Sequence, residues 1–144
     1  MSTPPQVPGL LRRLAAMSYD LILVFGLLLV GVALVVLPYS AFTGQPFPRS
    51  GWVHHLYQLY LLSILWGFYL YFWTHGGQTL GMRAWRLRLV RADGQPLTWA
   101  DGFKRLFWAS LTLAPLGLLP MVWDSQKQGL YDRLSRTQMQ LLSP

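Results

Sequence analysis

The sequence predicts an all-α membrane protein with two spanning helices, a third, proline-broken segment that is re-entrant or a hairpin, and a small cytoplasmic loop resembling a β-hairpin. Two observations predict this class. Hydrophobic residues make up 53% of the 144 residues and charged residues only 12%, whereas a soluble domain averages about 25% charged. Three apolar stretches, residues 10–37, 52–73 and 99–123, are separated by segments rich in glycine, proline or basic residues.

The first apolar stretch, residues 10–37, is long enough to cross a bilayer, which takes about 20 helical residues. It follows a polar, proline-rich segment, residues 1–9, which we predict to be a disordered tail. Pro38 is expected to end the helix, because the residue before a proline is pushed out of the helical region. The run is much longer than the roughly 7 to 15 apolar residues of a signal peptide, so we interpret it as a retained helix.

The second stretch, residues 52–73, also has the length of a spanning helix. Trp52 and Trp73 stand at its two ends, as expected for aromatic anchors at the two membrane–water interfaces. Polar residues and many aromatic residues make this stretch less apolar than the first. We predict that it crosses the membrane as the second helix.

The third stretch, residues 99–123, is expected to be interrupted near its middle. Pro115 and Pro120 each remove a helical N–H donor and clash with the preceding turn. Thr98 and Asp101 have the spacing of a capping box, with Asp in place of the usual Glu, and would start the helix. The stretch either crosses the membrane once or folds back as a broken hairpin.

The loop between the second and third stretches, residues 75–98, is predicted to contain a small hairpin. Apolar and basic residues alternate over 85–89, the period of a β-strand. The Asp-Gly pair at 93–94 is a turn signal, and 96–97 would begin a return strand. A basic amphipathic helix over 79–91, lying in the membrane interface, is the alternative.

Basic residues predict the orientation, because short cytoplasmic loops carry an excess of Lys and Arg. The net charge is +7, from twelve basic and five acidic residues. The arginines at 12–13 place the N-terminus in the cytoplasm, and the basic stretch 75–105 lies on the same side. If the third stretch folds back, the tail 124–144 is also cytoplasmic, and every basic residue except Arg49 lies on that side. The charge bias and the two prolines therefore favour folding back, although a single crossing stays open.

Asp20 stands inside the first apolar stretch, where a carboxylate costs roughly 2.5 to 3.5 kcal/mol on insertion scales. Arg13 lies seven residues earlier, on the same helix face. If the tail is cytoplasmic, Asp132 lies near the same membrane surface, and an Arg–Asp pair would hold the tail. Two interpretations of Asp20 stay open: a proton or cation site tuned by Arg13, or a structural pair that orients the first helix.

Several motifs, in this order, resemble the RDD family of small bacterial membrane proteins, which is named for one Arg and two Asp. The motifs are residues 13–16 with Tyr19 and Asp20, residues 77–83, 87–90, 93–94 and 96–97, Arg105, and residues 128–134 with Thr137. The resemblance covers nearly the whole chain after the N-terminal tail. It implies a single membrane domain over 10–144 in the bacterial inner membrane, with Arg13, Asp20 and Asp132 as the signature trio.

The resemblance also implies a function, since some family members are suspected of transport, including cation/proton exchange. We expect transport of a monovalent cation or small solute coupled to protons, with Asp20 and Asp132 as ionisable groups and Arg13 as their counter-charge. So few helices would line a pathway only as a homo-oligomer. The alternative is a non-transporting structural or accessory membrane protein in which the three charged residues hold helix ends together. Family members often have Lys in place of Met82 and His in place of Tyr131.

Other features predict neither catalysis nor a cofactor. Gly77, Thr79 and Gly81 are interpreted as a structural loop, because the G-K-[ST] sequence of a phosphate loop does not follow. Cysteine is absent, which excludes thiolate metal sites, and we predict no metal site and no enzyme activity. The basic residues flank apolar segments, so anionic lipid headgroups, rather than nucleic acid, are the expected partner.

Overall fold

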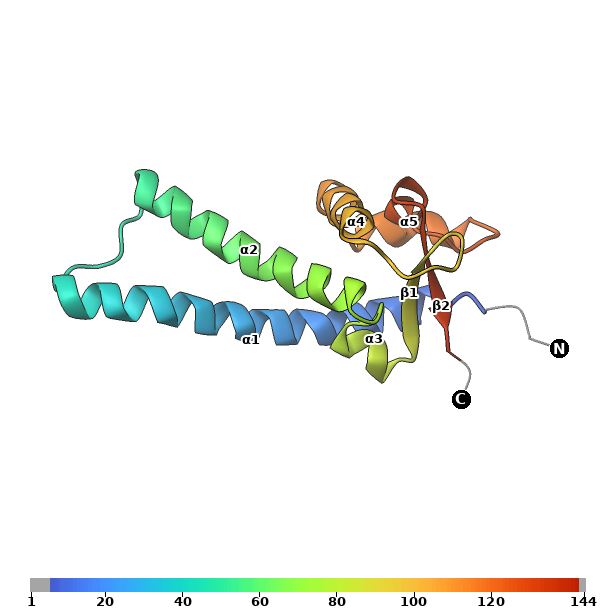
Figure 1. The fold of residues 1–144 in the computed structure, drawn as a ribbon, viewed down its shortest axis with the longest axis horizontal. Helices are drawn as coiled ribbons and strands as arrows, with labels where there is room; N and C mark the ends of the chain where they lie inside the picture. The colour runs from blue at the N-terminus through green and yellow to red at the C-terminus, as the bar shows by residue number, and fades with distance from the viewer. Residues whose placement is uncertain (1–5, 143–144) are drawn as a thin grey trace. The chain divides into compact units, whose positions relative to one another are not determined.

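The computed structural model describes residues 6–142, and Figure 1 shows the order of its elements. The elements are α1 Leu10–Thr43, α2 Trp52–Thr74, α3 Leu80–Ala84, β1 Leu87–Arg91, α4 Trp99–Leu111, the 3-10 helix η1 Leu116–Val122, α5 Leu130–Leu134 and β2 Thr137–Leu141. The described residues form two compact units, one of residues 6–20 and 69–142 and the other of residues 21–68. The single membrane domain over 10–144 stays a prediction.

The first helix, α1, continues past residue 37 to Thr43, so the prediction that Pro38 ends it is wrong. Proline removes only its own N–H donor, and the N–H groups after it still find carbonyl partners: the N–H of Gly44 donates to the carbonyl oxygen of Ser40 at 2.9 Å. The helix ends where Gly44 adopts a φ of 65°. This left-handed conformation is common for glycine after the last helical residue.

Within the unit of residues 21–68, α1 and α2 approach closely at Gly31. A Cβ atom built on Gly31 would lie 2.6 Å from Cδ1 of Ile64. The hydroxyl of Tyr60 donates to the carbonyl oxygen of Gly31 at 3.4 Å. Glycine is therefore needed at position 31 because the α2 side chains occupy the space that a larger residue would fill.

The predicted hairpin has a different strand partner. β1 pairs antiparallel with β2 from the C-terminal tail, in the register Leu87↔Leu141, Leu89↔Met139 and Arg91↔Thr137. The predicted turn does form, with Gly94 at a φ of 83°. The return strand at 96–97 is wrong, because Pro96 has no N–H for a strand ladder and the chain leads at once into the capping box of α4.

The two strands belong to two similar helix–turn–strand segments, α3–β1 and α5–β2. In each, a helix of five residues is followed by a turn and a strand of five residues. The last turn residue is Arg86 in the first segment, with a φ of 56°, and Arg136 in the second, with a φ of 52°. The strand register is centred on the Leu89–Met139 pair. An approximate two-fold axis through that pair therefore relates the two segments.

The predicted interruption of the third apolar stretch is confirmed, because α4 and η1 meet at an angle of 91°. The capping box at the start of α4 is also confirmed. The N–H of Asp101 donates to Oγ1 of Thr98 at 3.3 Å. The N–H of Thr98 donates back to Oδ2 of Asp101 at 3.0 Å. The box satisfies two backbone donors near the helix start that would otherwise lack partners.

Part of the predicted disordered tail is ordered. The N–H of Leu141 donates to the carbonyl oxygen of Gln6 at 2.8 Å, next to β2. Pro8 is buried. The prediction of a disordered tail is therefore wrong for residues 6–9, and residues 1–5 lie outside the described part of the chain.

Among the described residues, α1 is the one helix that by itself is long and apolar enough to cross a membrane. The bent pair α4 and η1 passes the same test only when the two are joined as a broken span or re-entrant loop. The predicted helix α2 forms over Trp52–Thr74. Its crossing stays a prediction, because its Trp, Tyr and His residues lower its mean hydropathy.

Candidate functional site

A buried ion-pair cluster is centred on Asp132, at the start of α5. Nη1 of Arg105, from α4, donates to Oδ1 of Asp132 at 2.6 Å. Nη1 of Arg13, from α1, donates to Oδ2 of the same carboxylate. The N–H of Gly129 also donates to Oδ2, at 3.0 Å. The exposed fractions are 2% for each arginine and 0% for Asp132, so the cluster is closed to solvent.

The two arginines have further partners that fix their positions. Nη1 of Arg105 donates to Oγ1 of Thr137 at 2.6 Å, which connects α4 to the start of β2. Nη2 of Arg13 donates to the carbonyl oxygen of Lys127 at 3.2 Å. The guanidinium carbon of Arg105 lies 4.8 Å from the centre of the Tyr131 ring. The cluster thus joins α1, α4, α5 and β2 through hydrogen bonds and a cation–π contact.

Electrostatics favour the ionised form of Asp132. Burial disfavours the charge, but Arg105 and Arg13 outweigh it and hold the pKa of the Asp132 carboxyl below its usual value. Burial raises the pKa of Tyr131 to about 12. Its phenol is therefore neutral at physiological pH and presents an uncharged ring to Arg105.

Asp20 occupies a second buried polar site, on α1. Oγ1 of Thr79 donates to Oδ2 of Asp20, and the N–H of Gly81 donates to Oδ1 at 2.8 Å. Thr79 is the N-cap of α3, and its hydroxyl also accepts from the N–H of Met82 at 3.2 Å. The Asp20 carboxylate therefore caps the N-terminus of α3, although it lies far from α3 in the sequence. Free N–H groups and the helix dipole favour an anion at that end of a helix.

The predicted structural loop has the glycines that its close contacts require. At Gly77 the φ is 71°, and a Cβ atom there would collide with the carbonyl oxygen of Leu89. At Gly81 a Cβ atom would collide with the carbonyl oxygen of Ala16 and lie 2.9 Å from the carboxylate of Asp20. The loop thus brings α3 against the backbone of α1.

The structure brings two of the three signature residues together. Arg13 and Asp132 form the ion pair that the sequence predicted. The predicted pairing of Asp20 with Arg13 is wrong, because the ion pairs found within residues 6–142 do not include Asp20. Its two carboxyl oxygens instead accept hydrogen bonds from a hydroxyl and a backbone N–H, both of which are neutral.

Sequence reasoning missed Arg105 as a member of the site. A signal for it was available once the capping box had set the start of α4. At 100° per residue, Arg105 falls on the same helix face as Gly102 and Leu106, and all three are buried. A lone arginine on the buried face of an amphipathic helix requires a buried anion as partner.

The chemistry of the two sites is that of hydrogen-bonded carboxylates, without a nucleophile beside a general base. Within residues 6–142, His, Asp and other metal-binding side chains do not gather in groups of three or more that would hold a metal ion. The charge cluster joins segments that are far apart in the sequence. The Asp20 site holds α3 against α1.

The fold and the two sites define a class: a mostly helical protein with one strongly apolar helix, whose buried Arg–Asp cluster joins that helix to a small two-stranded sheet. A match to the RDD family covers residues 7–136. The chain therefore belongs to the RDD family. It has no significant match among curated proteins and none among solved structures.

Proposed function

We propose that this RDD-family chain is an integral inner-membrane protein with a structural or accessory role, in which the signature charges attach the α3–β1 and α5–β2 segments to α1. The observation that carries the proposal is that both oxygens of each carboxylate are already engaged. Asp132 accepts from Arg13, Arg105 and Gly129, and Asp20 accepts from Thr79 and Gly81. A carboxylate with all of its partners in the protein serves attachment better than ion passage.

The proposal includes a topology in which residues 99–123 enter and leave the membrane on one side. β1 precedes this segment and β2 follows it, yet the two strands are hydrogen-bonded to each other. A segment that crossed the membrane once would place them on opposite sides. The pairing therefore supports folding back, with both strands and the N-terminus in the cytoplasm as the basic residues indicate.

Apolar side chains on α4 support its contact with lipid. Trp99, Phe103, Phe107 and Leu111 recur at every fourth position, and each is 48% to 66% exposed. Side chains at this spacing form one stripe along a helix. The opposite face packs inside the protein through Gly102, Arg105 and Leu106. We propose that the exposed stripe lies in the bilayer.

Proton-coupled transport is the second candidate, and one observation favours it. Asp20 is buried in the apolar helix α1, and its partners are a hydroxyl and an amide N–H, as given above. A carboxylate without a cationic partner takes up and releases a proton more readily than one held in an ion pair. A pathway through so few helices would require several copies of the chain.

Flux measurements in proteoliposomes separate the two candidates. Purified protein is reconstituted with a pH-sensitive dye inside the vesicles, and Na⁺ or K⁺ gradients are applied to wild type and Asp20→Asn. The structural proposal predicts no cation-driven pH change above protein-free vesicles in either protein. Cation-driven flux in wild type that disappears in Asp20→Asn, while the melting temperature is retained, would overturn the structural proposal and establish the transport candidate.

A further inference from the structure

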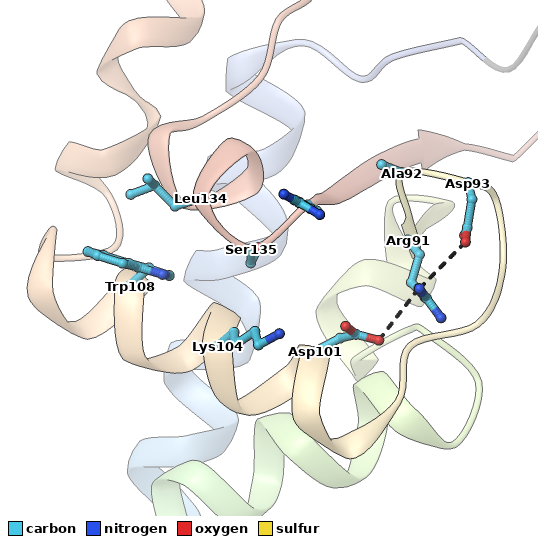
Figure 2. Close-up of a pocket in the computed structure, with 9 residues that line it drawn as sticks. Arg91, Ala92, Asp93, Asp101, Lys104, Trp108, Leu134 and Ser135 are labelled. Atoms are coloured by element: carbon cyan, nitrogen blue, oxygen red, sulfur yellow. Dashed lines mark ion pairs between the residues drawn. The ribbon is translucent and has the colours of Figure 1, made fainter.

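A cleft of about 730 Å³ lies beside α4, apart from the buried charge cluster. The end of β1 with the turn after it, the first three turns of α4, and the end of α5 with the turn before β2 line it. Figure 2 shows Asp101, Lys104 and Trp108 along α4, with Leu134 and Ser135 facing Lys104 and Trp108, and Arg91 beside Asp101. The cleft therefore combines three separate parts of the sequence.

Some of the charged side chains in the cleft form ion pairs, and others do not. Arg91 lies between two carboxylates, with Nη2 3.6 Å from Oδ2 of Asp93 and Nε 3.7 Å from Oδ2 of Asp101. Lys104 and Arg136 line the same cleft and are exposed. The ion pairs within residues 6–142 include neither of them. The cleft thus has two cations outside the ion pairs: Arg136, and Lys104, whose charge also acts on the Asp101 carboxylate three residues earlier on α4.

The backbone holds Arg136 at the edge of the cleft. Its N–H donates to the carbonyl oxygen of Arg133 at 3.2 Å, and its carbonyl oxygen accepts from the N–H of Ala92 at 2.9 Å. Both bonds hold the turn in which Arg136 adopts its left-handed conformation. The hydroxyl of Ser135 is already used, since it donates to the carbonyl oxygen of Tyr131 at 2.5 Å. Apart from the indole N–H of Trp108, the side-chain donors left for a ligand here are therefore the cationic groups of Lys104 and Arg136.

The position of the cleft on α4 points to the source of its anion. Lys104 and Trp108 follow Phe103 and Phe107 by one residue, which places them about 100° around the helix from the apolar stripe. Half-buried tryptophan and basic side chains beside an apolar surface are typical of the headgroup level of a membrane. A lipid with a phosphate group could contact the cations through its headgroup and the apolar stripe of α4 through its acyl chains.

We propose that this cleft binds the phosphate group of an anionic phospholipid, with Lys104 and Arg136 as its ligands and Trp108 beside the glycerol region. The inference rests on the proposed contact of α4 with the bilayer. The oxygens of a phosphate can accept from a lysine and an arginine at once, and phosphate is the anionic group that a phospholipid presents at the headgroup level. Arg91 is already paired with the Asp93 and Asp101 carboxylates, so the anion is expected to use Lys104 and Arg136.

Lipid binding by the purified chain tests the assignment. Native mass spectrometry in detergent compares retention of phosphatidylglycerol and phosphatidylcholine by wild type, by Lys104→Gln/Arg136→Gln, and by Arg83→Gln/Arg88→Gln. The last variant removes the same charge from exposed residues outside the cleft. We expect wild type and the control to prefer phosphatidylglycerol, and the cleft variant to bind it roughly tenfold or more weakly. Equal losses in both variants, or no loss in the cleft variant, would overturn the proposal.

Two further arms separate the alternatives. Competition with glycerol 3-phosphate at the lipid concentration is expected to leave the bound lipid in place, and equal displacement would assign the cleft to a soluble phosphate ester instead.

Carbonate extraction of cell membranes tests the proposed function by itself. A chain that is extracted contradicts the membrane proposal, whereas a chain that stays in the membrane with an unaffected cleft variant contradicts the cleft assignment alone. If the double variant does not fold, Lys104→Glu and Arg136→Glu repeat the test singly.

Discussion

Asp132 is held between two arginines that are themselves buried, so each of the three charges depends on the others. The structure places 0% of Asp132 and 2% of each of Arg13 and Arg105 in contact with solvent. Taking charges out of water is costly, and the close pairing offsets that cost only while the cluster is complete. The complete cluster of Arg13, Arg105 and Asp132 is therefore expected to be needed for folding.

Replacing Asp132 is therefore expected to destabilise the protein strongly. Asp132→Asn leaves Arg13 and Arg105 without a counter-charge, and breaking a buried pair costs about 3 to 5 kcal/mol. Thermal unfolding in detergent, followed by circular dichroism, measures the loss. Asp93→Asn is the matched control, because Asp93 forms an exposed pair with Arg91, and its loss costs less than about 1 kcal/mol. Similar melting temperatures for wild type and Asp132→Asn would contradict this account.

The same carboxylate predicts a pH dependence. The arginines lower the pKa of Asp132 in the folded state, so the folded form binds its proton less readily than the unfolded form. The contribution of Asp132 is complete above the unfolded value of about 3.9 and is lost as the pH falls through the lower folded value. Unfolding measured from pH 7 to pH 2 should show this loss in wild type. In Asp132→Asn this part of the acid dependence should disappear, and an unchanged profile would count against the assignment.

At the scale of elements, two short helices are attached to α1 by opposite arrangements of charge. At α3, the carboxylate comes from α1, as Asp20, and the helix supplies the N–H of Gly81. At α5, the carboxylate comes from the helix, as Asp132, and α1 supplies Arg13. The antiparallel β1–β2 pair joins the two helix–strand segments. Neither helix, at five residues, would be stable without these contacts.

Because α3 packs closely against α1 at Gly81, we expect a larger residue at this position to destabilise the protein. In Gly81→Ala, the added methyl group collides with the Ala16 carbonyl oxygen and crowds the Asp20 carboxylate, so we expect a loss of about 1 to 3 kcal/mol. Gly67→Ala, in α2, is the control, because nothing lies within 4 Å of its Cβ position. The control should be neutral or slightly stabilising, since alanine favours a helix over glycine by about 0.5 to 1 kcal/mol. Equal melting temperatures for the two variants would show that α3 is not packed as described.

At the scale of the whole molecule, the proposed topology places the segments before and after 99–123 on the same side of the membrane. The chain has no cysteine, so single-cysteine variants report accessibility without background. In Gln95→Cys and Ser125→Cys, we expect labelling by a membrane-impermeant maleimide only after the cytoplasmic side is opened. Ser50→Cys, between α1 and α2, should be labelled from outside in intact cells. Labelling of Ser125→Cys from the outside would support a single crossing instead.

Local sequence patterns were enough to predict the apolar helices, the capping box at Thr98, the turn at 93–94 and the interruption at Pro115 and Pro120. Each of these follows from local chemistry: helix length, side-chain acceptors for backbone N–H groups, and a missing N–H at proline. The motif order also identified the RDD family. The extent of α1 was misjudged, because the hydrogen bonds after Pro38 still have carbonyl partners.

Which distant groups contact one another is visible only in the folded chain. Alternation marked β1 as a strand but did not identify β2 as its partner, because many segments offer free backbone donors and acceptors. The pattern paired Asp20 with Arg13, yet in the fold α3 supplies Asp20 with N–H and O–H donors, and Asp132 takes Arg13 and Arg105 together. Burial makes each charge require a partner, but the choice of partner depends on how the elements pack.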